Sequence, residues 1–136
     1  MLAIVIPYYK INYFEETLKS LSNQTDKRFK VYIGDDNSCD NPLEIIKKYS
    51  SNLNIKYEKF NDNLGSISLV KQWGRCLNLL ENETWVMILG DDDVLSDNFV
   101  EEFYNNLNKF ENTISVIRYS TFKIDEKSNY TTKKHT

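Results

Sequence analysis

The sequence predicts an α/β protein that contains a mainly parallel sheet with helices on both faces. Short apolar runs suited to strands alternate along the chain with segments whose apolar residues recur at helical spacing. Strand–helix–strand units of this kind form parallel sheets with right-handed crossovers. The length of 136 residues, of which 40% are hydrophobic and 27% charged, suits one globular domain with a single core.

The N-terminal residues indicate the first strand and the first helix. Residues 2–6 form a largely β-branched run that Pro7 ends, which predicts a strand buried on both faces. Asn12 can cap a helix, because Glu15 follows three residues later as in a capping box. The apolar stripe of this helix consists of Phe14, Leu18 and Leu21.

A second strand–helix unit and a third strand follow. Residues 31–33 favour a strand, and Pro42 suits the first position of a helix. This helix presents Leu43, Ile46 and Tyr49. Residues 55–60 alternate between apolar and polar side chains, which predicts a strand near an edge of the sheet.

The second half of the chain contains two more strands and two helices. The first of these helices carries Leu69, Trp73, Cys76 and Leu80, flanked by Val70 and Leu77. Residues 84–89 form the most apolar run and predict a buried strand. The last helix presents Phe99, Phe103, Leu107 and Phe110, and a fifth strand is predicted at residues 114–122. Because the composition turns polar from Asp125 onward, we predict a subdomain of residues 1–124 and a flexible tail of residues 125–136.

Composition excludes several classes of function. The net charge of −3 and the pI of about 5.2 leave no basic field of the kind that attracts nucleic acid. No segment reaches the roughly 20 apolar residues of a transmembrane span. Cys39 and Cys76 form no CxxC pair and are expected to be free thiols in a reducing, cytoplasmic compartment. The four glycines match no dinucleotide-binding or P-loop motif, and the only histidine, His135, lies in the predicted tail.

Polar side chains follow each of the first four predicted strands. In an open α/β sheet, ligands bind in the crevice beyond the carboxyl ends of the strands. These ends carry Tyr8, Tyr9 and Lys10 after the first strand, residues 35–38 after the second, residues 61–65 after the third, and Asp91, Asp92 and Asp93 after the fourth. The sequence therefore predicts a polar ligand site at this edge of the sheet.

The acidic residues at two of these strand ends indicate a cation. Three consecutive carboxylates, Asp91 to Asp93, repel one another unless a cation or solvent offsets their charge. Mg²⁺ or Mn²⁺ takes one or two protein carboxylates together with substrate phosphates, so the triplet can hold a nucleoside diphosphate through the metal. The alternative is that the triplet begins a turn and caps the next helix. Asp35 and Asp36 fit either an ordinary turn or a carboxylate that accepts a ring N–H of a base such as uracil.

Four motifs occur in order at the four strand ends. They are residues 5–9 (VIPYY), 35–40 (DDNSCD), 63–65 (NLG) and 89–93 (LGDDD). This combination resembles the family 2 glycosyltransferases, which are inverting enzymes with the GT-A fold. The resemblance covers residues 1–122 and implies a Rossmann-like GT-A fold, of which the chain is the N-terminal, nucleotide-sugar-binding portion.

The resemblance also implies roles for individual residues. The implied nucleotide-binding residues are Pro7, Tyr8, Tyr9, Asp36, Asn63, Gly65, Arg75 and Asp91. Asp36 matches the carboxylate that reads the base, and Asp92 matches the metal ligand, with Asp93 as second choice. For Arg75, an approach to the diphosphate and a solvated position on the helix are both open. Lys10 and Gly74 depart from the family pattern.

The implied function is inverting, Mn²⁺- or Mg²⁺-dependent transfer of a sugar from a UDP- or GDP-linked donor to a glycan or lipid-linked acceptor. Such transfer needs a general base, which in this family lies in the later, acceptor-binding half. We therefore expect an inactive N-terminal fragment, truncated before that half, because Glu101 and Glu102 lie on a helix face and are no substitutes. In the full-length protein we expect a position at the inner face of the membrane.

Two other functions fit parts of the pattern. One is a nucleotide-binding α/β module without catalysis, which would use the same crevice. The other is a phospho-acceptor receiver domain, which is also α/β and binds Mg²⁺ through clustered aspartates. Receiver domains resemble one another in having an acidic pair after the first strand, where this chain has Pro7, Tyr8 and Tyr9.

Overall fold

The computed structural model describes residues 1–110 and 113–135. The chain divides into two compact units, Met1–Tyr104 and Asn105–Thr136. The subdomain predicted at residues 1–124 was defined by nucleotide-sugar binding and not by compactness alone. Its boundary at residue 124 therefore stays a prediction.

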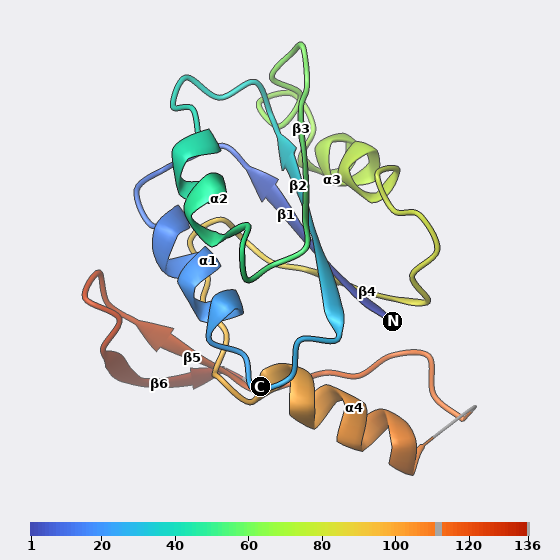
Figure 1. The fold of residues 1–136 in the computed structure, drawn as a ribbon. Coiled ribbons are helices and arrows are strands. Elements are labelled where there is room, and N and C mark those ends of the chain that lie inside the picture. Colours follow the sequence, from blue (N-terminus) through green and yellow to red (C-terminus); the bar gives the residue numbers. More distant parts are fainter. Residues whose placement is uncertain (111–112, 136) are drawn as a thin grey trace. The chain divides into compact units, whose positions relative to one another are not determined.

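The first unit contains a four-stranded parallel sheet in the order β3-β2-β1-β4. The strands are β1 (Leu2–Tyr8), β2 (Phe29–Asp35), β3 (Ile55–Lys59) and β4 (Trp85–Ile88), and Figure 1 shows them side by side. This order is that of dinucleotide-binding folds, whereas receiver-type sheets have the order 2-1-3-4-5. The predicted parallel α/β sheet is confirmed, and the sheet order is evidence against the receiver-domain hypothesis.

The two central strands form the core, because they are covered on both faces. Ile4, Ile6 and Ile33 are fully buried, and β3 lies at an edge as its alternating pattern predicts. The strand at residues 84–89 was expected to be buried, and that prediction is wrong. β4 is the other edge strand among the described residues, and its Val86 side chain is 48% exposed.

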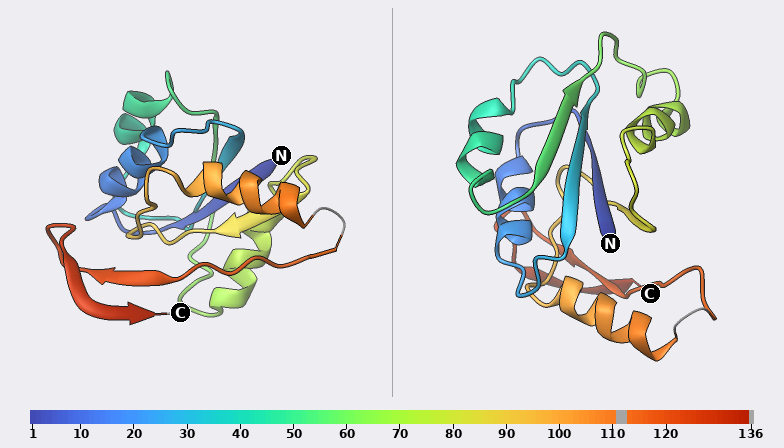
Figure 2. Two further views of the ribbon diagram at one scale, coloured as in Figure 1. Left: turned by 90° about the horizontal axis from the view of Figure 1, so that it is seen from below. Right: turned by 45° about the vertical axis from the view of Figure 1, so that its right-hand side comes forward.

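Helices cover both faces of this sheet. Helices α1 (Phe14–Ser22) and α2 (Leu43–Tyr49) lie side by side on one face, and α3 (Leu69–Leu77) packs on β1 and β2 from the other. The two views of Figure 2 show the same arrangement. The sheet is thus covered as a doubly wound sheet requires.

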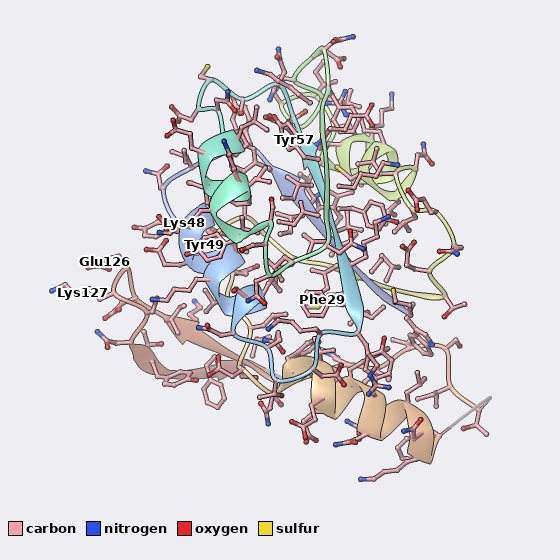
Figure 3. The ribbon with its side chains drawn as sticks, viewed as in Figure 1. Phe29, Lys48, Tyr49, Tyr57, Glu126 and Lys127 are labelled. Atoms are coloured by element: carbon pink, nitrogen blue, oxygen red, sulfur yellow. The ribbon has the colours of Figure 1, made fainter. Side chains whose placement is uncertain are left out.

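Helix α1 begins without the predicted cap. Its N-cap residue is Tyr13, and no side chain caps the helix. Glu15, which was expected to complete a capping box with Asn12, instead accepts hydrogen bonds from Lys48 and Tyr49 of α2. Figure 3 labels both partners. The predicted apolar stripe of Phe14, Leu18 and Leu21 is confirmed, since all three are fully buried.

Helix α3 confirms the C-terminal part of its predicted apolar stripe, where Cys76 is buried and Leu77 packs against the core, but not the N-terminal part. Its buried side chains are Gln72 and Cys76, whereas Leu69 is 56% exposed and Val70 is 80% exposed. The helix lies close to β2 because Gly34 has no side chain: a Cβ there would stand 2.4 Å from the Cys76 sulfur. Close contact at Gly34 therefore decides which face of α3 is buried.

Helix α4 (Phe99–Lys109) also differs from its predicted stripe. Phe103 is buried as predicted, and its buried neighbours are Val100 and Tyr104. The ring of Phe103 packs edge-on against Trp85, with ring centroids 5.7 Å apart. Phe110, expected on the apolar face, is 49% exposed.

The second unit contains an antiparallel hairpin of β5 (Thr121–Ile124) and β6 (Tyr130–His135). The strand predicted at residues 114–122 is therefore wrong for most of its length, and the segment expected to fray after Asp125 contains a strand. The Asp125 carboxylate explains the turn, because it accepts hydrogen bonds from the backbone N–H groups of Lys127 and Asn129, each at 2.9 Å. A turn built on local hydrogen bonds needs no apolar periodicity.

Candidate functional site

A cleft of about 720 Å³ lies where β1 and β4 end, within the size range of small-molecule sites. It is lined by Pro7, Tyr8, Tyr9, Lys10, Asp36, Leu69, Gln72, Trp73, Ile88, Gly90, Asp91, Asp92 and Asp93. Seven of these were predicted site residues, namely Pro7, Tyr8, Tyr9, Asp36, Asp91, Asp92 and Asp93. The fold thus brings residues from three strand ends and one helix to a single crevice.

A smaller cleft, of about 340 Å³, lies at the other end of the sheet. It is lined by Lys27, Phe29 and residues 51–54. Figure 3 labels Phe29, the first residue of β2. This cleft has no carboxylate in its lining and lies at the amino end of the strand, where open α/β sheets rarely bind ligands. The first cleft is therefore the candidate site.

Asp36 is buried and all of its oxygen acceptors are occupied by protein donors. One oxygen accepts from the Leu64 backbone N–H at 2.7 Å and from Arg75 at 2.6 Å. The other accepts from Asn63 and from the Gly65 backbone N–H, both at 2.9 Å. Asn63 and Gly65 do not line the cleft themselves; they hold Asp36. The predicted reader of the base is, in this structure, the residue that ties the 63–65 loop to the end of β2.

Arg75 lies behind Asp36 and not in the cleft. Its guanidinium binds Asp36 and Asp62, each at 2.6 Å, and its carbon lies 4.1 Å from the centre of the Phe60 ring. Its Nε donates to Gln72. The sequence left open a solvated helix position or an approach to the diphosphate. In the structure Arg75 neutralises the buried Asp36 carboxylate, and its approach to the diphosphate stays a prediction.

Asp35 and Tyr8 form a second saturated group. Asp35 accepts from the Ser38 backbone N–H at 2.8 Å and from the Tyr57 hydroxyl at 2.6 Å. The Tyr8 hydroxyl donates to the backbone oxygen of Asp40 at 2.7 Å. Burial, with Asp35 nearby, raises the pKa of Tyr8 to about 12. Because its hydroxyl is engaged and stays protonated, Tyr8 contributes packing to the cleft wall and not acid–base chemistry.

Asp91 connects the ends of β1 and β4. One of its oxygens accepts hydrogen bonds from the backbone N–H groups of Tyr9 and Lys10, each at 2.8 Å. The residues after β1 are therefore positioned by the first member of the acidic triplet, which leaves one Asp91 oxygen outside these contacts.

Asp92 and Asp93 form no ion pair within residues 1–110 and 113–135, whereas Asp36 is paired with Arg75. Both crowd Gly90: a Cβ there would stand 2.7 Å from an Asp93 oxygen and 3.1 Å from an Asp92 oxygen. Burial, and then the nearby Asp92, raise the pKa of Asp93. Two unneutralised carboxylates side by side fit a divalent cation.

The described residues contain no group of three or more histidine, cysteine or acidic side chains placed to hold a metal ion. A cation at Asp92 and Asp93 would therefore take its remaining ligands from water or from a bound phosphate, as Mg²⁺ does in nucleotide sites.

Several lining residues were not predicted. Lys10 and Gly90 adjoin predicted residues, and Ile88 is the last residue of β4. Leu69, Gln72 and Trp73 come from α3, where helical periodicity suggested core positions for Leu69 and Trp73 and no role for Gln72. Their contribution depends on the rotation of α3 about its axis, which no local pattern specifies.

Comparison with known proteins places the chain among glycosyltransferases. The model of the family described as glycosyl transferase family 2 matches residues 3–135. An uncharacterised glycosyltransferase of Mycoplasma pneumoniae is 33% identical over 105 residues, which are 74% of this chain and 33% of that protein. The glycosyltransferase GlyA of Streptococcus pneumoniae is 28% identical over 127 residues, 92% of this chain and 18% of that protein.

Solved structures with a similar fold include a glycosyltransferase, TarS. The crystal structure of residues 1–349 of Staphylococcus aureus TarS in complex with UDP has a TM-score of 0.72 at 25% identity, covering 86% of this chain and 38% of that one. The same protein in complex with UDP-GlcNAc has a TM-score of 0.72 at 24% identity, covering 86% and 37%. TarS carries the name poly(ribitol-phosphate) beta-N-acetylglucosaminyltransferase.

The chain spans about a third or less of the length of these curated relatives. Within the described residues, we find no helix with the length and apolar character needed to cross a membrane. Both cysteines are free, as the sequence predicts.

Proposed function

The chain belongs to glycosyl transferase family 2, and from that premise we propose that it is the donor-binding part of an inverting, metal-dependent glycosyltransferase. The donor is a nucleoside diphosphate sugar, and the acceptor is a glycan or a lipid-linked glycan. Asp92 and Asp93, two cleft carboxylates without a protein cation, are the observation that carries this proposal.

The charge distribution in the cleft explains how such a donor would bind. A diphosphate is anionic and would be repelled by the acidic triplet alone. Mn²⁺ or Mg²⁺ held by Asp92 and Asp93 would offset both sets of charges and stabilise the diphosphate as it leaves. The free oxygen of Asp91 remains for a ribose or phosphate hydroxyl, since its other oxygen binds the backbone after β1. Lys10 lines the same end and adds positive charge.

A UDP-linked donor is the first candidate, because the structural neighbour TarS binds UDP and UDP-GlcNAc. A GDP-linked donor is the alternative. We propose that the general base comes from outside the described residues, so that this chain alone binds the donor without transferring the sugar. Of the cleft carboxylates, Asp36 is saturated by protein donors, Asp92 and Asp93 are assigned to the cation, and the remaining oxygen of Asp91 is assigned to the donor. Glu101 and Glu102 are exposed on α4.

We place the protein on the cytoplasmic side of the membrane, where free thiols such as Cys39 and Cys76 persist. A nucleotide-binding module without catalysis would use the same cleft. Release of nucleoside diphosphate from the donor by the full-length protein distinguishes the enzyme from that module.

The binding proposal is tested by calorimetric titration of the chain with UDP and with GDP, each with and without Mn²⁺. We expect binding that requires Mn²⁺ and that weakens at least about tenfold in Asp92→Ala and Asp93→Ala, because each removes a metal ligand. The larger loss identifies the main ligand. Glu58→Ala is the matched control, since it removes an exposed carboxylate of β3 outside the cleft. Metal-independent binding, or equal affinities in all three variants, would contradict the proposal.

A further inference from the structure

Helix α3 exposes large apolar side chains along the cleft. Leu69 and Trp73 both line the cleft and are 56% and 39% exposed. They are four residues apart and therefore lie on one face of the helix. Exposed apolar surface beside a polar cleft is typical of a ligand-binding surface.

The rotation of α3 is held by buried polar contacts, so this exposure is built into the fold. Gln72 is buried, and its amide donates to the Gly34 backbone oxygen at 3.4 Å, while its oxygen accepts from Arg75. Ser68 caps the helix by accepting from the Lys71 backbone N–H at 3.3 Å. Turning the helix to bury Trp73 would expose Gln72 and break these contacts.

The two ends of the cleft differ in chemistry. The end formed by Asp92 and Asp93 has free carboxylates, which suit a cation and a diphosphate. At the α3 end, Asp36 and Gln72 have their polar atoms engaged within the protein. A sugar ring there would find few partners for its hydroxyl groups, whereas a flat, aromatic group needs mainly a surface to stack on.

We propose that the indole ring of Trp73 is the surface on which the nucleobase of the donor stacks, with Leu69 extending that surface. This inference rests on the proposed donor-binding function and adds a residue that determines how the base is held. Base–aromatic stacking tolerates different bases, because every base has a π face. Trp73 then supplies affinity, and discrimination between bases comes from other contacts.

The first test is calorimetric titration with UDP, GDP and inorganic pyrophosphate, each with Mg²⁺. We expect Trp73→Ala to weaken UDP or GDP binding by about 5- to 150-fold, the range typical for loss of one base–aromatic stack, and to leave pyrophosphate binding unchanged. Trp73→Phe should restore most of the affinity, because it keeps an aromatic face. Val70→Ala is the matched control: Val70 is an apolar residue of the same helix, 80% exposed, outside the cleft lining.

The second test uses fluorescence, since Trp73 and Trp85 are the only tryptophans. In a Trp85→Phe background, UDP with Mg²⁺ should quench Trp73 emission, and pyrophosphate with Mg²⁺ should not. Trp85 packs against Phe103 and does not line the cleft, so its replacement leaves the site intact.

The outcomes separate the two proposals. Metal-dependent UDP binding that is lost in Asp93→Ala but unchanged in Trp73→Ala overturns the stacking inference alone. An equal loss of UDP and pyrophosphate binding in Trp73→Ala also overturns it, because the indole would then support the cleft as a whole. No binding of UDP, GDP or pyrophosphate by the unmodified chain overturns both.

Discussion

The acidic residues after β2 and those after β4 lie at the same end of the sheet, but their oxygens have different partners. All four oxygens of Asp35 and Asp36 accept hydrogen bonds from protein donors, including the Arg75 guanidinium. Asp92 and Asp93 have no cationic partner among the residues that the structure describes. Burial and the neighbouring carboxylates Asp92 and Asp91 raise the pKa of Asp93, and a backbone hydrogen bond from Gly90 offsets part of this effect.

This difference separates carboxylates that hold the loops of the site from carboxylates that we propose as ligands of a cation. A buried carboxylate with its full set of donors stabilises the loop that supplies them, and its removal leaves those donors unpaired. Adjacent carboxylates without a cationic partner repel one another and cost stability in the free protein, which is a common property of binding sites. Three substitutions test the distinction through stability, since a carboxylate that accepts protein hydrogen bonds should stabilise the fold and one that is only crowded by other carboxylates should not.

The largest effect is expected for Asp36→Ala. This substitution removes the buried carboxylate partner of Arg75, which keeps only the exposed Asp62 as an ion-pair partner, and leaves two backbone N–H groups without their acceptor. The free energy of unfolding should therefore fall by about 3 to 5 kcal/mol. Urea denaturation measures the change. Asp62→Ala is the control, because it removes the other Arg75 carboxylate, which is 69% exposed, and should cost less than about 1 kcal/mol. Equal losses in the two variants would show that Asp36 does not organise the loop.

An intermediate effect is expected for Asp91→Ala. The Asp91 carboxylate accepts two backbone hydrogen bonds that join the end of β1 to the end of β4. Their loss should lower the free energy of unfolding by about 1 to 3 kcal/mol, the usual cost for hydrogen bonds to a charged group. Asp92→Ala, whose carboxylate contacts neither N–H group, should leave the melting temperature nearly unchanged. A drop in both variants would mean that the whole triplet is structural.

The smallest effect, of opposite sign, is expected for Asp93→Asn. Because the pKa of Asp93 is raised above its ordinary value of 3.8, the folded state binds its proton more tightly than the unfolded state. This carboxyl therefore lowers stability as the pH rises through its folded-state pKa, and the deficit is complete at neutral pH. At pH 7 and without metal, Asp93→Asn should raise the free energy of unfolding by less than about 1 kcal/mol, since solvent screens the repulsion.

Thermal unfolding across the pH range checks this result. The gain should disappear well below pH 3.8, where both variants are protonated or neutral. A gain that persists at low pH would mean that packing, and not charge, explains it.

Sequence periodicity was sufficient to predict the helices and strands whose packing partners are close in the chain. The stripe of Phe14, Leu18 and Leu21 and the parallel strands follow from residue spacing and from short connections. It failed at α3, where the apolar residues Leu69 and Val70 are exposed and the polar Gln72 is buried. It also failed at residues 114–122, where hydrogen bonds of the Asp125 turn decide the position of the hairpin.

The sequence by itself determined the α/β class, the order of the elements and the collection of polar residues at the strand ends, because strand and helix periods and parallel connections are local properties of the chain. Only the tertiary structure decided which acidic residues are saturated. The side chain of Asn63 that binds Asp36 is 27 residues away in the chain, and Arg75 is 39 residues away. A carboxylate's role depends on donors that folding brings to it from such distances, and residue type alone does not specify them.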